Sequence, residues 1–295
     1  MKVNSTQLSA TSRLFSSTVI RELASKGKSA LFARLIGESC LDLNSSSLAR
    51  VADAFDAALS VLRAGSHRDE YVYKAALTEK ILFGRHSLKT ACMLTEFRVG
   101  SRKADLAILN GSATVYEIKS ERDSLTRLDD QLKAYRNVFS KIYVVAGENH
   151  VDAVLAKADP DIGVLLLSKR RQISSVREAA YRADLICPLT ILDSIRTPEA
   201  AVILRELGEE VPNVPNTAMR TELRRVFARL GPERTHDAMV KTLKRTRNLQ
   251  PLESLVSDLP NSLQAAALTV PIRRADHGRL VGAVQTDLHA AMRWA

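Results

Sequence analysis

Cysteine, aromatic residues and long apolar runs are all scarce in this chain of 295 residues. The cysteines, Cys40, Cys92 and Cys187, are odd in number and form no paired motif, which argues for a reducing compartment and against structural zinc. Aromatic residues make up only 5% of the sequence, so a platform for stacking bases is not a strong expectation. No apolar segment could span a bilayer and no secretory signal opens the chain. These absences predict a cytoplasmic protein with no membrane partner.

The sequence also lacks internal repeats and a glycine-rich phosphate loop, which argues against a nucleotide-driven motor. Positive charge, by contrast, is in excess. The 43 Lys and Arg residues outnumber the 33 Asp and Glu residues, and the pI is near 9.7. This balance suits a polyanionic partner, although only clustering of the charges makes the argument specific. One such cluster runs from Arg220 to Arg247, where basic residues far outnumber acidic ones.

Apolar periodicity predicts an α/β core in the middle of the chain. Three successive strands, a helix and two further buried strands are expected at Leu94–Val99, Ala104–Leu109, Ala113–Ile118, Asp123–Phe139, Ile142–Ala146 and Ile162–Leu167. A helix before them carries apolar residues and Glu79 on one face.

Two carboxylates and a lysine stand out within this core: Asp105, Glu117 and Lys119. Hydrolysis of a phosphodiester at neutral pH needs a divalent cation, and Mg²⁺ prefers a few carboxylates together with water. Two neighbouring carboxylates favour such a cation because they would otherwise repel each other. Side chains alternate along a strand, so Lys119 shares a face with Glu117 and can stabilise a developing oxyanion.

The two carboxylates can meet only in one hairpin register. If Asp105 lies opposite Glu117, Leu109 must lie opposite Ala113, and residues 110–112 form a three-residue loop. A two-residue turn at 110–111 would put the carboxylates on opposite faces, because a slip of one residue reverses every side chain. We therefore predict the three-residue loop or an equivalent bulge.

The order of elements and residues resembles the PD-(D/E)xK nuclease superfamily, and within it a bacterial family of unassigned role. The resemblance extends over Tyr71 to Leu167 and rests on Asp105, on Glu-Ile-Lys-Ser at Glu117 to Ser120, on the Asp123 to Leu128 stretch, and on Gln131 and Tyr135. Ala104 stands where the superfamily's name has proline, a residue that supplies no ligand.

The resemblance implies a restriction-endonuclease-like core of a helix, a three-strand meander, a helix and a strand. It also implies Mg²⁺ or Mn²⁺ held by Asp105, Glu117 and the carbonyl group of Ile118, with Lys119 catalytic and Gln131 supporting the site. A third acidic residue is usual, and Glu79 and Glu96 are both candidates. Basic residues near the site are candidates for phosphate contacts: Arg98, Arg102, Lys103, Arg122, Arg127, Lys133 and Arg136.

Helical segments are expected on both sides of the core. We predict an N-terminal helical segment at residues 1–66, the core at 67–195 and a C-terminal helical region at 196–295. One N-terminal helix should follow capping residues Ser45 to Ser47 and end at Gly65. Prolines at 212 and 215 interrupt the C-terminal region, and two basic helices follow. These helices either read DNA as a loose helix-turn-helix or pack on the core.

The function that these features predict is metal-dependent phosphodiester hydrolysis, with DNA as the expected substrate. Two other classes remain open. One is a nuclease-fold module that binds nucleic acid without cutting it, and the other is an interaction protein of a phage or defence system. A duplex cutter also needs two sites, so a homodimer is one expected assembly.

Overall fold

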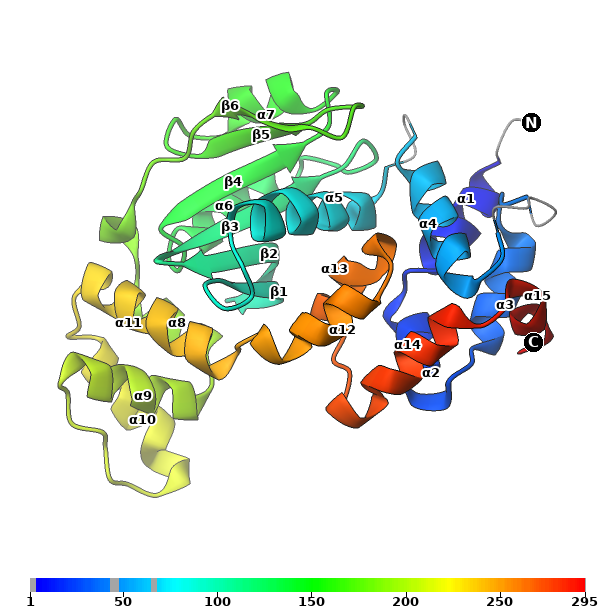
Figure 1. Cartoon of the computed structure of the whole chain (residues 1–295). Coiled ribbons are helices and arrows are strands. Elements are labelled where there is room, and N and C mark those ends of the chain that lie inside the picture. Colours follow the sequence, from blue (N-terminus) through cyan, green and yellow to red (C-terminus); the bar gives the residue numbers. More distant parts are fainter. Residues whose placement is uncertain (1–3, 43–47, 65–67, 295) are drawn as a thin grey trace. The chain divides into compact units, whose positions relative to one another are not determined.

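The computed structural model describes residues 4–42, 48–64 and 68–294, which form two compact units (Figure 1). The helical unit comprises Met1–Ile81, Lys169–Arg171 and Gln250–Ala295, and the sheet unit comprises Leu82–Ser168 and Gln172–Leu249. The predicted capping residues Ser45 to Ser47 and Gly65, with the predicted boundary at residue 66, lie outside the described residues. This division differs from the predicted three segments, because the C-terminal region separates after Leu249 into parts that belong to different units.

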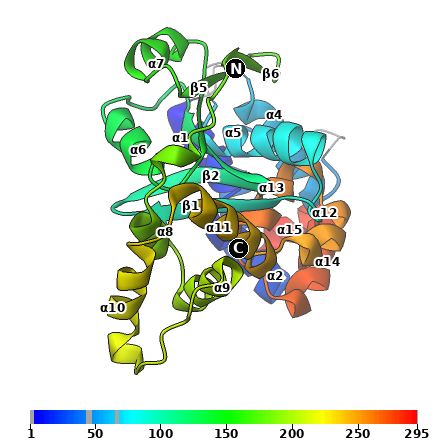
Figure 2. The ribbon, with the colours of Figure 1, turned by 90° about the vertical axis from the view of Figure 1, so that its left-hand side faces the viewer.

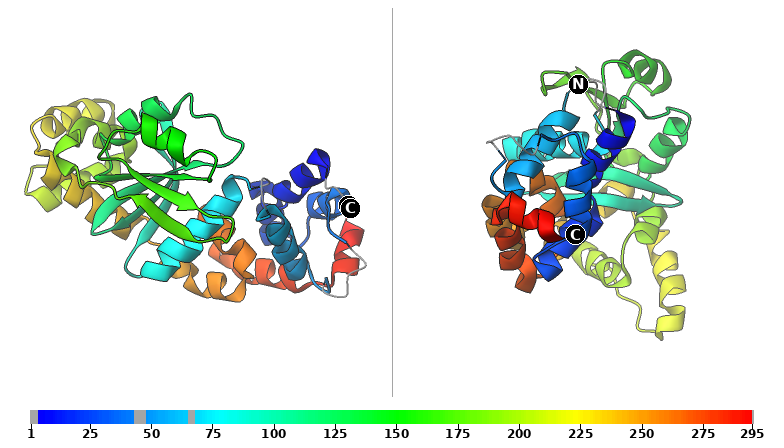
Figure 3. Two further views of the ribbon diagram at one scale, coloured as in Figure 1. Left: turned by 90° about the horizontal axis from the view of Figure 1, so that it is seen from above. Right: turned by 90° about the vertical axis from the view of Figure 1, so that its right-hand side faces the viewer.

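The helical unit joins the two ends of the chain. Helix α14 lies beside α2, and a backbone bridge joins Arg50 to Asp287 (Figures 1 and 3). Phe15, Phe32 and Phe55 meet in its core with ring centroids between 5.2 and 5.6 Å apart in two pairs. Its elements are α1 (Ser5–Arg13), α2 (Ser17–Lys26), α3 (Ala30–Glu38), α4 (Val51–Leu62), α5 (Glu70–Leu77), the π-helix η2 (Thr78–Phe83), which runs past the unit boundary, η4 (Gln250–Leu252), α12 (Glu253–Asp258), α13 (Asn261–Thr269), η5 (Arg274–Asp276), α14 (His277–Gln285), α15 (Leu288–Ala291) and η6 (Met292–Trp294).

The sheet unit contains one sheet of six strands in sequence order, so the predicted mixed α/β fold is confirmed. The strands are β1 (Cys92–Val99), β2 (Arg102–Asn110), β3 (Ser112–Lys119), β4 (Lys141–Ala146), β5 (Gly163–Leu167) and β6 (Ile173–Arg177). The first three form an antiparallel meander, β4 and β5 follow in parallel, and β6 returns antiparallel. Strand β6 was not predicted, because its half-exposed sequence, Ile-Ser-Ser-Val-Arg, lacks the apolar run of a buried strand.

Helices cover the sheet face on which Ala113, Val115 and Glu117 lie. Apolar side chains of α6, α8, α9, α10 and α11 share one core with that face, and α11 contacts both β2 and β3 (Figures 1 and 2). The basic helices α10 and α11 are therefore part of this core. The helices of the unit are α6 (Leu128–Tyr135), α7 (Val151–Lys157), η3 (Ala183–Leu185), α8 (Pro188–Ser194), α9 (Thr197–Leu207), α10 (Asn216–Phe227) and α11 (Pro232–Thr246).

Helix α6 is shorter than the periodicity predicted. Asp123 accepts hydrogen bonds from the backbone N–H and the hydroxyl group of Ser120, both at 2.7 Å. Ser124 and Thr126 also bond to each other. Such local side-chain bonds compete with helical backbone bonds, so the helix begins only at Leu128.

The β2–β3 hairpin has the predicted register. Leu109 lies opposite Ala113, and Asn110 pairs with Ser112, which leaves Gly111 alone at the tip with a φ of 71°. That φ lies in the left-handed region, which glycine enters without steric cost. A methyl group at this position would meet no heavy atom within 4 Å outside the neighbouring residues, so the requirement for glycine comes from the backbone alone.

Gly111→Ala should therefore lower the free energy of unfolding by about 1 kcal/mol, the usual cost of a left-handed L-residue. Gly111→Asn should cost less, since asparagine tolerates this conformation through local hydrogen bonds. Urea denaturation of both variants and the wild type measures the difference. Equal loss in the two variants would mean that the tip is sensitive to side-chain bulk instead.

Candidate active site

A buried ion pair lies at the end of β3. The Lys119 Nζ donates to Glu117 Oε1 at 2.8 Å, and both residues are almost fully buried, with 6% and 1% of their surface exposed. Because the two residues are two apart on one strand, their side chains project from the same face. A buried charge is costly without a partner, so this pair is stable only because each residue neutralises the other.

Helix α6 completes the surroundings of this pair. Gln131 accepts a second hydrogen bond from Lys119 Nζ, at 3.0 Å. The hydroxyl of Tyr135 lies 2.8 Å from Glu117 Oε2. Gln131 and Tyr135 are four residues apart, a spacing that puts both on one side of a helix. The spacing is a signal in the sequence by which Tyr135, part of the family resemblance, can be assigned to the site as well.

Burial governs the protonation of the site. It raises the pKa of the Glu117 carboxyl, and the neighbouring Lys119 ammonium opposes that rise. Burial, followed by the negative charge of Glu117, also raises the pKa of Tyr135 well above its usual value, and Asp105 adds to this effect. Tyr135 therefore stays protonated, and its single proton is shared between Glu117 Oε2 and the Lys103 carbonyl, each 2.8 Å away. A cation beside Glu117 offsets the cost of burying its charge.

Asp105 reaches the same region from β2. The ladder between β2 and β3 ends at Leu106 and Tyr116, one residue short of the predicted pairing of Asp105 with Glu117. Beyond it, Asp105 Oδ2 accepts a hydrogen bond from the backbone N–H of Ile118 at 2.8 Å. The structure thus brings Asp105 next to Ile118, the residue between Glu117 and Lys119.

Glu96 is the nearer of the two candidates for a third acidic residue. In the register of β1 with β2, Glu96 falls opposite Asp105, and the two carboxylates have oxygens within 4.8 Å of each other. Glu117 does not join them at that distance among the described residues. The φ of Glu96 is 52°, an uncommon left-handed conformation for a non-glycine residue, and the pairing skips it. Such local strain often occurs at functional sites.

Glu79, the other candidate, lies in the helical unit. Its carboxylate forms ion pairs with Arg63 at 3.5 Å and with Lys80 at 2.7 Å. The sheet unit instead contains Glu96, Asp105, Glu117, Lys119 and Gln131 together.

The predicted phosphate-contacting residues divide into two groups. Three of them are engaged with carboxylates: Arg102 pairs with Asp130 at 2.8 Å, Lys103 with Glu96 at 3.6 Å, and Arg136 with Asp159 and Asp161. The remaining four are exposed, and within the described ranges they have no ion pair: Arg98, Arg122, Arg127 and Lys133. These four are better placed for an external phosphate than Arg136, which is mostly covered.

A family model identifies the relatives of this chain. The model described as Bacteriophage P4 protein cII matches residues 63–261, a span that contains the whole sheet unit and every residue of the candidate site. The chain belongs to this family. One relative, Protein cII of Enterobacteria phage P4, is 38% identical over 120 residues, which cover 40% of this chain.

The match to the cII protein of phage P4 covers only 44% of that relative, so the chain spans less than half the length of the curated protein. No solved structure matches the chain. No helix of the described residues is both long and apolar enough to cross a membrane.

Proposed function

We propose that this member of the cII family is a metal-dependent nuclease that hydrolyses phosphodiester bonds, with DNA as the expected substrate and a restriction-endonuclease-like core. The observation that carries the proposal is the buried Lys119 ammonium, held between Glu117 and Gln131 beside the Asp105–Ile118 contact. A lysine that served only packing would have no need of two polar partners in a buried position at a sheet end. Burial of a charge is instead typical of sites that use it.

The donor atoms suit the metal that this chemistry requires. Glu96, Asp105, Glu117 and the Ile118 carbonyl offer only oxygen, the ligand type that Mg²⁺ and Mn²⁺ prefer. Both Glu117 oxygens are already engaged, Oε1 by Lys119 and Oε2 beside the Tyr135 hydroxyl. The donor types suit such an ion next to Glu96 and Asp105, and Glu117 would have to move closer to share it. When bound, the ion would activate a water and neutralise charge on the phosphate.

Lys119 has a separate task. Its ammonium carries three protons, and the bonds to Glu117 and Gln131 use two of them. The third is available to a water or a phosphate oxygen. Because Glu117 and Gln131 hold the ammonium in place, little reorganisation is needed when charge develops on the phosphate, which is the condition for effective electrostatic catalysis.

Asp105→Asn tests the proposal. The asparagine oxygen still accepts the Ile118 N–H bond, so the fold should persist while the metal loses a charged ligand. We expect wild-type cleavage of supercoiled, linear or single-stranded DNA with Mg²⁺ or Mn²⁺, none with EDTA, and at least about a 100-fold loss in the variant. RNA substrates in the same series decide between the two nucleic acids.

The matched control is Asp129→Asn, which removes an exposed carboxylate of α6 that lies 4.0 Å from Lys157. Its cleavage rate should stay within about twofold of the wild type, as is usual for surface substitutions. Equal activity in Asp105→Asn and the wild type would refute the assignment of the site. Absence of cleavage under every condition would leave the chain as a binding module.

A further inference from the structure

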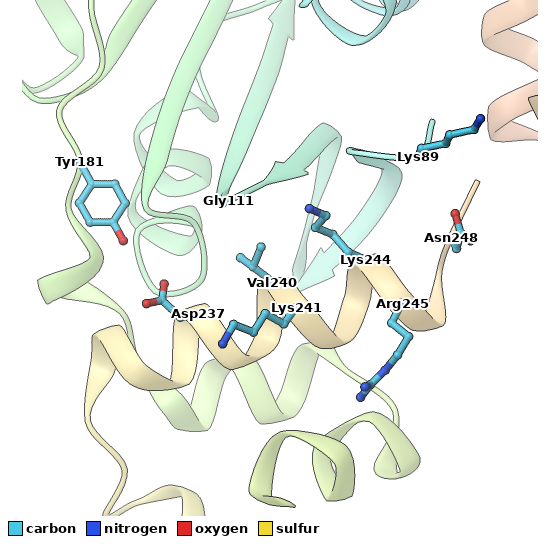
Figure 4. A pocket seen from close by; sticks show the side chains of 9 residues that line it. All are labelled: Lys89, Gly111, Tyr181, Asp237, Val240, Lys241, Lys244, Arg245 and Asn248. Carbon is cyan, nitrogen blue, oxygen red and sulfur yellow. The ribbon is translucent and has the colours of Figure 1, made fainter. Parts of the chain in front are cut away.

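A second candidate binding site lies at the other end of β3, around the tip of the β2–β3 hairpin. A pocket of about 630 Å³ opens between that tip and helix α11 (Figure 4). This volume is within the usual range for small-ligand sites. The lining residues all belong to the sheet unit: Lys89, Gly111, Tyr181, Asp237, Val240, Lys241, Lys244, Arg245 and Asn248.

The lining is strongly basic, with four cationic side chains against the single carboxylate of Asp237. Lys241 has an ion pair, and a long one, with Glu206 at 3.7 Å. Among the residues that the structure describes, Lys89, Lys244 and Arg245 have no carboxylate within ion-pair distance. In Figure 4 the Lys244 ammonium points towards the hairpin tip, whereas Lys89 and Arg245 extend away from the middle of the pocket. Unpaired cations gathered in one hollow favour an anionic ligand.

Tyr181 gives the pocket an aromatic wall. It is one of the few large apolar side chains at the surface, with 49% of its area exposed. The ring is held edge-to-face against His236, with 6.2 Å between ring centroids. Figure 4 shows its hydroxyl directed into the space above α11. An exposed but oriented aromatic ring next to cations is the arrangement that stacks a nucleobase while phosphates are held nearby.

His236 packs against the ring of Tyr181 on the side away from the pocket and holds it in place. The histidine is completely buried, and burial lowers its pKa, which favours the neutral ring. Its Nε2 accepts the backbone N–H of Ala113 at 3.3 Å, so Nδ1 carries the proton and donates to Asp237 at 3.0 Å. The carboxylate of Asp237, the lone acidic group of the pocket, is therefore engaged in part by His236. Through its contacts with Ala113 and Tyr181, His236 also links α11 to the hairpin and to the aromatic ring.

The pocket and the candidate active site lie along the same strand. Gly111 and Glu117 are six residues apart, which is roughly 20 Å of extended chain. Helix α11 lies on the sheet face that carries Glu117. Since consecutive nucleotides of a strand advance about 3.4 Å each in a duplex, roughly six nucleotides would reach from one site to the other.

We infer that this pocket binds a nucleotide unit of a nucleic-acid strand, with Tyr181 stacking on the base and Lys241 and Lys244 holding phosphates. The inference rests on the proposed function for its ligand class and adds a contact outside the site of hydrolysis. The inference also assigns phosphate binding to part of the basic run from Arg220 to Arg247.

Binding in EDTA tests the inference without cleavage. The probe is a fluorescein-labelled oligothymidylate of about 20 nucleotides, longer than the usual footprint of a small single-strand-binding surface. Its anisotropy is followed with the full chain at several salt concentrations. The variant Lys241→Gln/Lys244→Gln removes two pocket charges. The control Arg225→Gln/Arg229→Gln removes two exposed charges outside the pocket, so both variants have the same net charge.

We expect the pocket variant to bind at least about tenfold more weakly and the control to change less than about twofold. The slope of log K on log salt should become shallower by about 1.4, the value for two lost phosphate contacts on a single strand. Tyr181→Ala should weaken binding of the single strand about fivefold or more, with little effect on a duplex of the same length.

Equal effects of the two charge variants would overturn the inference, and so would unchanged binding in the pocket variant. If thymidine monophosphate displaced the oligonucleotide at similar concentrations, the ligand of the pocket would be a free nucleotide and not a nucleic-acid strand. Thermal unfolding of each variant verifies its fold. Because the measurement involves no cleavage, it tests nucleotide binding by the pocket independently of the nuclease proposal.

Discussion

Lys119→Met should reduce the proposed metal-dependent cleavage at least about 100-fold, because it removes the buried ammonium that this mechanism places against the phosphate. Methionine keeps most of the side-chain length, so Glu117 and Gln131 lose a hydrogen-bond partner but no space is left empty. Turnover of DNA under saturating Mg²⁺ measures the effect. A rate within a few-fold of the wild type would show that Lys119 is merely structural.

The same variant should be less stable, by about 3 kcal/mol at neutral pH, since it leaves the Glu117 carboxylate buried without its cation. Burial already holds the pKa of Glu117 above its ordinary value of 4.5. Stability linked to a raised carboxyl pKa is present below pH 4.5 and is lost as the pH rises through the folded-state pKa. The deficit of Lys119→Met should therefore be smaller at pH 5 than at pH 8, as thermal unfolding at the two values would reveal.

Glu117→Gln/Lys119→Met separates the two effects. It removes both charges, so most of the stability and its weak pH dependence should return. Cleavage should stay at or below the level of the single variant, because both the ammonium and a charged metal ligand are missing. Recovery of cleavage together with stability would refute a role of Glu117 and Lys119 in hydrolysis.

A second large effect is expected far along the chain, at Glu199. Glu199→Gln should lower the free energy of unfolding by about 3 kcal/mol, the lower end of the range for a broken buried ion pair, since Arg247 keeps 22% of its side chain exposed. The carboxylate accepts two bonds from Arg247, at 2.8 and 2.9 Å, and one from the backbone N–H of Arg196. Arg247 also lies over the ring of Phe97 in β1.

The pair holds α9 and α11 against the strand that carries Glu96, so its loss should loosen one side of the candidate site. Burial alone would raise the pKa of Glu199, but the bonds from Arg247 and Arg196 lower it overall. Stability from a lowered carboxyl pKa is present above pH 4.5 and disappears as the pH falls through the folded-state pKa. The difference between wild type and variant should accordingly shrink in acid.

Glu206→Gln is the matched control on the same helix. Its carboxylate is exposed and lies 3.7 Å from Lys241, so its removal should change stability by less than about 0.5 kcal/mol. Chemical denaturation of both variants at pH 7 and pH 4 compares them. Similar losses in the two variants would show that the Arg247 pair contributes no more than an ordinary surface contact.

Local pattern was sufficient for most of the core elements. The meander, the helix with Gln131 and the strand after it all follow from apolar periodicity, and the hairpin register follows from the need to place Asp105 near Glu117. Periodicity failed where burial was partial, as in β6, and where side chains bonded to the nearby backbone, as before α6. In β6 the apolar pattern was too weak to indicate a strand. Before α6 the side-chain hydrogen bonds of Asp123 outweighed the helical periodicity.

By itself the sequence determined the mixed fold, the strand face shared by Glu117 and Lys119, and the one-sided spacing of Gln131 and Tyr135, because each depends only on the repeat of a strand or a helix. The tertiary structure alone decided that Glu96 approaches Asp105, that Glu79 belongs to another unit, and that the basic residues of α11 border a pocket with Tyr181. Those outcomes depend on which apolar faces pack together. Packing brings together residues that are far apart in the chain, and the local periodicity of the sequence does not predict such contacts.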